Sequence, residues 1–177
     1  LYNIKIFFVQ KMDIKKKQAK LKELADSLKD LTVEELEAKE QEIIKQADEN
    51  DKKVGSTEFD LPKENYKVVS EAIQYFLNKQ TVEWQYTLGL LSIYEFWNPD
   101  NYSKTISYPM LDATLRTLGD MRFTGYEEWA RVIAINKYFE VLRGEYEEVT
   151  ESIYDIANEH NAIIDELNLR KPILEKK

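Results

Sequence analysis

A heptad repeat of apolar residues runs through the last third of the chain and constrains the fold more than any other sequence feature. Apolar or partly apolar side chains recur at alternating intervals of three and four, at Val132, Ile135, Phe139, Leu142, Tyr146, Val149, Ile153, Ile156, His160, Ile163 and Leu167. We call this set the heptad seam. Its spacing places one stripe along a single helical face, which another surface must shield. The pattern therefore predicts an all-α protein built on a long C-terminal helix.

The heptad seam passes through Gly144 without a change of phase. A turn at Arg143-Gly144 would have no reason to preserve that phase, and one glycine costs only about 1 kcal/mol relative to alanine in a helix. We therefore expect one helix of roughly 40 residues or more, ending at Lys171-Pro172, over two helices joined at Gly144. Further apolar residues lie off the seam and predict packing of its first half against the central helices, namely Trp129, Ile133, Tyr138 and Ile164.

The first 50 residues contain two further amphipathic patterns. Apolar residues stand at helical spacing at Ile14, Leu21, Leu24, Leu28 and Leu31, and then in a narrow stripe at Val33, Leu36, Ile43, Ile44 and Ala47. Between them, Thr32 and Glu35 have the spacing of a capping box, in which side chains and backbone N–H groups bond reciprocally at a helix start. We therefore predict a charged antiparallel helical hairpin over residues 12–50, with one kinked arm as the alternative.

A linker is expected between this hairpin and the rest of the chain. Residues 51–63 hold the only dense cluster of polar residues, glycine and proline in the first half. Asp60 is a candidate cap for the helix that follows, with Pro62 in its first turn. Beyond the linker we predict one helical bundle over residues 64–170, followed by a short tail over residues 171–177.

Three shorter helices are predicted ahead of the long one, over residues 63–78, 82–97 and 107–119. The second is apolar nearly all round, which is typical of a buried helix. We place Trp84, Leu88, Leu91, Ile93, Tyr94 and Trp97 in the core. The wider aromatic set is interpreted as core, with a protein-binding surface or a small-molecule pocket as alternatives; it comprises Trp84, Tyr86, Tyr94, Phe96, Trp97, Tyr102 and Tyr108.

Residues 1–11 are interpreted as a leader or a disordered segment. They contain a short apolar run, but no basic stretch precedes it and no small-residue cleavage site follows it, so a signal peptide is not expected. Met12 opens a strongly helical polar segment, and we hypothesise that it is the biological start.

The balance of charge narrows the classes of partner. Asp and Glu number 33 against 25 Lys and Arg, for a formal net charge of −8, whereas affinity for nucleic acid comes mostly from Lys and Arg. A nucleic acid is therefore not an expected general partner. A local basic cluster is interpreted as a solvated helix face, with a docking site for an acidic partner or nucleic acid as the alternative; its members are Lys11, Lys15, Lys16, Lys17, Lys20 and Lys22.

Other absences exclude whole classes of chemistry. The chain has no cysteine, so neither a disulfide framework nor thiolate chemistry is expected. No apolar stretch reaches the ~18 residues that a membrane span needs, and no phosphate-binding loop, nucleophile elbow or zinc motif is present.

His160 is the only histidine. A polar residue at a heptad core position typically sets register or partner choice, and its protonation near pH 6 would loosen an interface.

Glu147, Glu148 and Glu151 form the string E-E-x-x-E on the predicted long helix. This string resembles half of the magnesium-binding signature of the all-α nucleotide pyrophosphohydrolases related to the MazG family. The resemblance implies a magnesium-dependent nucleotide hydrolase, although the E-x-x-D half of the signature is missing. A solvated flank of a coiled coil is the other interpretation of these carboxylates.

Together these patterns favour a soluble, non-enzymatic structural, assembly or adaptor protein that acts through helix-mediated contacts with itself or another protein. The expected contact residues are Tyr146, Val149, Ile153, Ile156, His160, Ile163 and Leu167 on the seam, with Lys15, Lys16 and Lys20. No cofactor, metal or small-molecule substrate is expected. The expected location is the cytoplasm, or the virion if the protein is a bacteriophage component. The alternatives are an all-α magnesium-dependent nucleotide pyrophosphohydrolase and a helical small-molecule-binding regulator.

Overall fold

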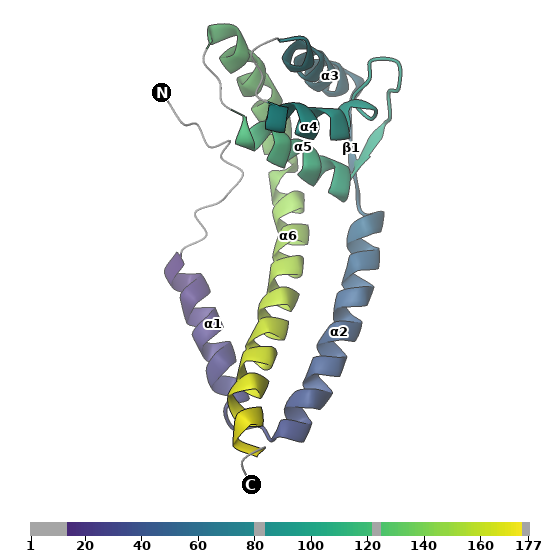
Figure 1. The fold of residues 1–177 in the computed structure, drawn as a ribbon. Coiled ribbons are helices and arrows are strands. Elements are labelled where there is room, and N and C mark those ends of the chain that lie inside the picture. The colour runs from purple at the N-terminus through teal and green to yellow at the C-terminus, as the bar shows by residue number, and fades with distance from the viewer. Residues whose placement is uncertain (1–13, 80–83, 122–124, 175–177) are drawn as a thin grey trace. The chain divides into compact units, whose positions relative to one another are not determined.

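The computed structural model describes residues 14–79, 84–121 and 125–174, and over these residues the chain is mostly helical (Figure 1). The elements are α1 (Ile14–Leu28), α2 (Val33–Ser56), β1 (Glu58–Asp60), α3 (Lys63–Asn78), α4 (Trp84–Tyr94), β2 (Thr105–Ser107), α5 (Tyr108–Asp120) and α6 (Tyr126–Leu174). The predicted all-α class, N-terminal hairpin and long C-terminal helix are confirmed. Thr81 and Thr124 are candidate N-caps from the sequence for the helix over residues 82–97 and for the long C-terminal helix, and both lie outside the described residues.

The chain divides into two compact units rather than into one hairpin and one bundle. The first unit holds residues 54–146, and the second holds α1, α2 as far as Lys53 and α6 from Glu147 onward. The sequence instead assigned residues 64–170 to a single bundle. The difference arises because the two halves of α6 contribute to two separate cores.

Helix α6 is continuous over 49 residues and runs straight through Gly144, which confirms the prediction of a single helix. A Cβ placed at Gly144 would meet no atom within 4 Å, so no close contact requires glycine there. The predicted end at Lys171-Pro172 is wrong, because the helix extends to Leu174. A proline lacks a backbone N–H donor, yet the helix continues for two residues beyond Pro172.

The second unit is a three-helix arrangement in which α1 and α2 flank the C-terminal half of α6 (Figure 1). The predicted capping box at the start of α2 is confirmed. The Thr32 N–H donates to Glu35 Oε2 at 2.7 Å, and the Glu35 N–H donates to Thr32 Oγ1 at 3.2 Å. The core of this unit joins all three helices and consists of Leu28, Leu36, Ile43, Ile163 and Leu167.

The first unit packs α3, α4 and α5 with the N-terminal half of α6. Its fully buried residues include Val69, Ile73 and Phe76 of α3, Leu90 and Ile93 of α4, Leu111 and Leu118 of α5, and Val132, Ile135 and Phe139 of α6. The off-seam residue Tyr138 is also buried, as predicted, whereas Ile133 is half exposed. The prediction that α4 is buried all round is wrong, because Leu88 and Leu91 are 57% and 54% exposed.

A two-stranded antiparallel sheet replaces part of the predicted linker and part of the segment between the helices predicted over residues 82–97 and 107–119. Residues 51–63 hold the end of α2 and β1, which pairs with β2 so that buried Phe59 lies opposite buried Ile106. Asp60 belongs to β1 and is not a helix cap, and α3 follows Pro62 without a side-chain capping bond. The segment therefore holds ordered structure that contributes apolar residues to the core.

Candidate interaction groove

An open apolar groove of about 290 Å³ lies between α2 and α6 within the second unit. Its α2 wall consists of Ile43, Ile44, Ala47, Asp48, Asn50 and Asp51, and its α6 wall consists of Ile153, Ile156, Ala157 and His160. Three members of the heptad seam are therefore in the groove. We call this surface the α2–α6 groove.

The groove opens where the side chains on α2 become small or polar. Nearer the α1–α2 turn, the seam residues Ile163 and Leu167 are fully buried against the other apolar residues of the three-helix core. Farther along α6, the helix faces Ala47 and Asn50, and Ile153 and Ile156 are only partly buried. A small side chain and an amide cannot cover two isoleucines, so part of the seam remains exposed to solvent.

Charge is distributed unevenly around the α2–α6 groove. Its lining includes the carboxylates of Asp48 and Asp51, and no lysine or arginine. Elsewhere in the unit, carboxylates of α6 are paired: Lys20 Nζ lies 2.7 Å from Asp155 Oδ2, and Lys39 Nζ lies 3.2 Å from Glu159 Oε1. The α2 edge of the groove is therefore an acidic border on an apolar surface.

Direct contacts between α2 and α6 hold the two walls in register. The Ser152 hydroxyl donates to Asn50 Oδ1 at 3.2 Å and lies 2.7 Å from the Val149 carbonyl. The Lys39–Glu159 ion pair joins the same two helices nearer the start of α2, whereas the Ser152–Asn50 bond joins them nearer its end. These contacts position the walls of the groove without filling it.

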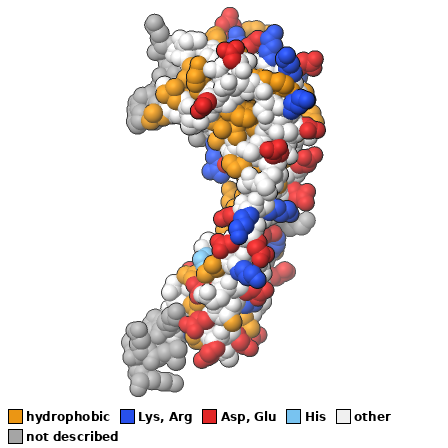
Figure 2. Space-filling model, turned by 90° about the vertical axis from the view of Figure 1, so that its right-hand side faces the viewer, with side chains coloured by type: hydrophobic (Ala, Val, Ile, Leu, Met, Phe, Trp, Pro, Cys, Tyr) orange, Lys and Arg blue, Asp and Glu red, His pale blue; other side chains and the backbone are white. Residues whose placement is uncertain are grey.

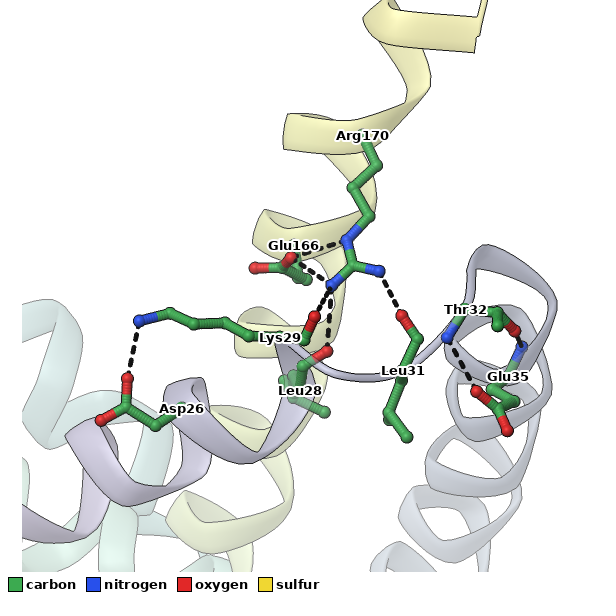
Figure 3. A network of polar contacts seen from close by, with 8 residues as sticks. All are labelled: Asp26, Leu28, Lys29, Leu31, Thr32, Glu35, Glu166 and Arg170. Atoms are coloured by element: carbon green, nitrogen blue, oxygen red, sulfur yellow. Dashed lines mark hydrogen bonds and ion pairs between the residues drawn. The ribbon is translucent and has the colours of Figure 1, made fainter.

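Arg170 fastens the α1–α2 hairpin to the end of α6 (Figure 3). Its guanidinium donates to the carbonyls of Leu28 at 3.1 Å and Lys29 at 2.7 Å, and also to the carbonyl of Leu31. Glu166, one turn earlier on α6, accepts from Arg170 Nε at 2.7 Å. The last carbonyls of a helix lack partners within the helix and favour a nearby cation, so Arg170 caps α1 from another element.

The structure separates the predicted contact residues into three groups. Ile153, Ile156 and His160 line the α2–α6 groove, and Val149 is partly buried on the same helix. Ile163 and Leu167 belong to the core of the second unit, so they are not a surface for a partner. Tyr146 belongs to the first unit, where its hydroxyl donates to Asp112 Oδ1 at 2.7 Å and its ring stacks on Tyr108.

The predicted basic cluster does not form a separate site among the side chains that the structure describes. Lys20 pairs with Asp155, and Lys17 Nζ lies 5.7 Å from the centre of the Tyr154 ring. Lys15 and Lys16 belong to α1, but their side chains lie outside the described ones, as does Lys11. Figure 2 views the molecule from the side on which α2 lies, and on that face Lys and Arg are interspersed with Asp and Glu.

The prediction that the central aromatic residues are core holds for only part of the set. Trp97 and Tyr108 are buried, Tyr86, Tyr94 and Phe96 are partly buried, and Tyr102 is 36% exposed. The indole of Trp97 is fully buried and donates from Nε1 to Thr114 Oγ1 at 2.9 Å. The Tyr66 hydroxyl lies within hydrogen-bond distance of the carbonyls of Phe96 and Asn98, and Ser70 donates to the Trp97 carbonyl. These side chains satisfy carbonyls just beyond the end of α4. Burial raises the pKa of the Tyr66 hydroxyl.

The carboxylates of the E-E-x-x-E string lie on α6, from Glu147 to Glu151. Within the described ranges, no three His, Cys, Asp or Glu residues come together in a group able to hold a metal ion. No helix in the described part of the chain is long and apolar enough to cross a membrane. No protein-family model, curated protein or solved structure matches the chain.

The sequence reasoning found the α6 wall of the groove but missed the α2 wall. The signal lay in the narrow stripe of Ile43, Ile44 and Ala47, which Asp48 and Asn50 interrupt. The sequence analysis predicts that stripe only as one apolar face of the second helix of the hairpin. Along α2, the change from large apolar to small and polar side chains marks where the side chains of α2 and α6 no longer fill the space between the two helices.

Proposed function

We propose that this protein is a non-enzymatic assembly or adaptor protein that binds a helix of a partner protein in the α2–α6 groove. The observation that carries the proposal is the partial exposure of the seam isoleucines Ile153 and Ile156 in an open groove. On the same helix, the later seam residues Ile163 and Leu167 are buried. An amphipathic helix that lays its apolar face into an apolar groove is a recurrent mode of recognition between proteins.

Covering the groove would be energetically favourable. Ile44 is 40% exposed, and Ile153 and Ile156 are partly exposed. Burying a whole isoleucine side chain contributes about 1.5–3 kcal/mol, so completing the burial of each contributes roughly 1 kcal/mol. Such anchor residues at the centre of a contact supply most of the binding free energy in protein complexes.

The experiment is a selection from a library of amphipathic helical peptides, with the whole protein immobilised as the target. We expect the wild-type protein to enrich peptides that share an apolar stripe, and we expect Ile44→Glu to lose them. The matched control is Ile133→Glu, which changes a similarly exposed isoleucine in the first unit and should retain the peptides. Equal retention by both variants, or no enrichment by the wild-type protein, would count against the proposal.

A further inference from the structure

We infer that the helix bound in the α2–α6 groove carries lysine or arginine beside its apolar stripe, so that the partner is an apolar and basic helix. This inference rests on the proposed function, because it specifies the chemistry of the partner for the same groove. It follows from the dimensions of the groove and from the charges along its α2 edge.

The length of the groove fits a short helical stretch. Its α2 wall extends from Ile43 to Asp51, and its α6 wall extends from Ile153 to His160. At 1.5 Å per residue these walls are about 12 Å and about 10 Å long, or roughly two helical turns. A partner helix presents apolar residues at i, i+3 or i+4, and i+7 over that distance. The groove therefore accommodates two or three apolar side chains from one helix.

The acidic edge determines the charge that should flank this stripe. Asp48 and Asp51 are exposed and three residues apart, so both project along the same side of α2. Among the residues that the structure describes, no lysine or arginine pairs with either carboxylate. A glutamate or aspartate brought beside them would be repelled, whereas a lysine or arginine would be attracted.

The opposite edge does not compete for the same charge. His160 is the polar residue on the α6 wall, and the other lining residues of that wall are isoleucine and alanine. The lining therefore has its carboxylates, Asp48 and Asp51, on the α2 wall, and it contains no lysine or arginine on either wall.

The experiment compares two fluorescein-labelled 18-residue helical peptides with the same leucine stripe, one flanked by lysine and the other by glutamate. Binding to the full chain is measured by fluorescence anisotropy at pH 7.5 and 150 mM salt. We expect the leucine–lysine peptide to bind at least tenfold more tightly than the leucine–glutamate peptide. The double substitution Asp48→Lys with Asp51→Lys should weaken the leucine–lysine peptide by about tenfold, since each exposed charge pair contributes a factor of roughly two to five.

A matched control separates the groove from the overall negative charge of the protein. Glu23→Lys with Asp165→Lys changes the net charge by the same amount at two exposed positions that do not line the groove. This variant should bind the leucine–lysine peptide within about twofold of the wild-type protein at 150 mM salt, where screening is strong beyond roughly 8 Å. Circular dichroism of both variants verifies that the helices are retained.

The outcomes distinguish this inference from the proposed function. Equal binding of the two peptides, or equal weakening by the two double substitutions, overturns the inference and leaves the groove as an apolar docking site. Association of the protein with itself in light scattering, lost in Ile44→Glu, makes a second copy the occupant and also overturns the inference. If neither peptide binds and the helical library also yields nothing, both the inference and the proposed function fail.

Discussion

Replacing Arg170 with methionine should loosen the attachment of the α1–α2 hairpin to α6. Hydrogen bonds that involve a charged group each contribute about 1.5–3 kcal/mol. The Arg170 side chain is 23% exposed, so the lower end of that range applies. Three such bonds would total about 4.5 kcal/mol, and water replaces part of what the freed carbonyls lose, so the free energy of unfolding should fall by about 2–3 kcal/mol.

Urea denaturation followed by circular dichroism measures this loss, and hydrogen exchange with mass spectrometry locates it. Amide protection should decrease in α1 and in the turn at residues 29–31, because the carbonyls of Leu28, Lys29 and Leu31 lose the bonds from the guanidinium. Arg170→Lys should give an intermediate stability, since an ammonium group keeps the charge near the end of α1 but cannot reach three acceptors in a planar fork.

Arg116→Met is the matched control for this prediction. Arg116 Nε lies 2.7 Å from a carboxylate four residues earlier on its own helix, as Arg170 Nε does, but the Arg116 side chain is 72% exposed. An exposed pair of this kind contributes at most about 1 kcal/mol. If Arg170→Met costs no more than Arg116→Met, the bonds between the guanidinium and the hairpin carbonyls do not stabilise the protein, and the reasoning is refuted.

Three further predictions concern local packing and pH. In thermal melts, Gly144→Ala should raise the free energy of unfolding by about 0.5–1 kcal/mol. Gly89→Ala should give no such gain, because its Cβ would stand 3.0 Å from Thr117 Cγ2. Thr32→Ala should cost about 1 kcal/mol in urea denaturation through loss of the cap, and an unchanged midpoint would contradict this. Burial raises the pKa of Tyr138 above its usual 10.0. Above about pH 10 the unfolded chain therefore loses this proton while the folded protein keeps it. The contribution of Tyr138 to the free energy of unfolding should be constant up to about pH 10 and then fall by up to about 1.4 kcal/mol per pH unit. Tyr138→Phe should show a shallower alkaline decline in denaturation series from pH 9 to 11.

The features that the sequence predicted correctly are those set by short-range periodicity. The phase of the heptad seam across Gly144 was sufficient to predict one continuous helix, because a helical face depends only on spacing along the chain. The Thr32–Glu35 capping box was predictable for the same reason, since its two bonds join residues three apart.

The features that the sequence missed depend on contacts between distant segments. Phe59 and Ile106 pair in strands of only three residues, too short for an alternating pattern to stand out. Residues off the heptad seam predicted that the first half of α6 packs against the central helices, and α3 and α5 do contact it. The sequence did not predict that the second half packs against α1 and α2. The open part of the groove depends on how Ala47 and Asn50 face Ile153 and Ile156, which neither helix reveals alone.

The second unit is assembled from two stretches of chain separated by the whole of the first unit. During synthesis, Leu28, Leu36 and Ile43 leave the ribosome while the residues that cover them, Ile163 and Leu167, have not yet been made. About 120 residues at 5–20 residues per second correspond to a delay of roughly 6–24 s. For that interval the newly made hairpin exposes an apolar stripe that its third helix does not yet cover.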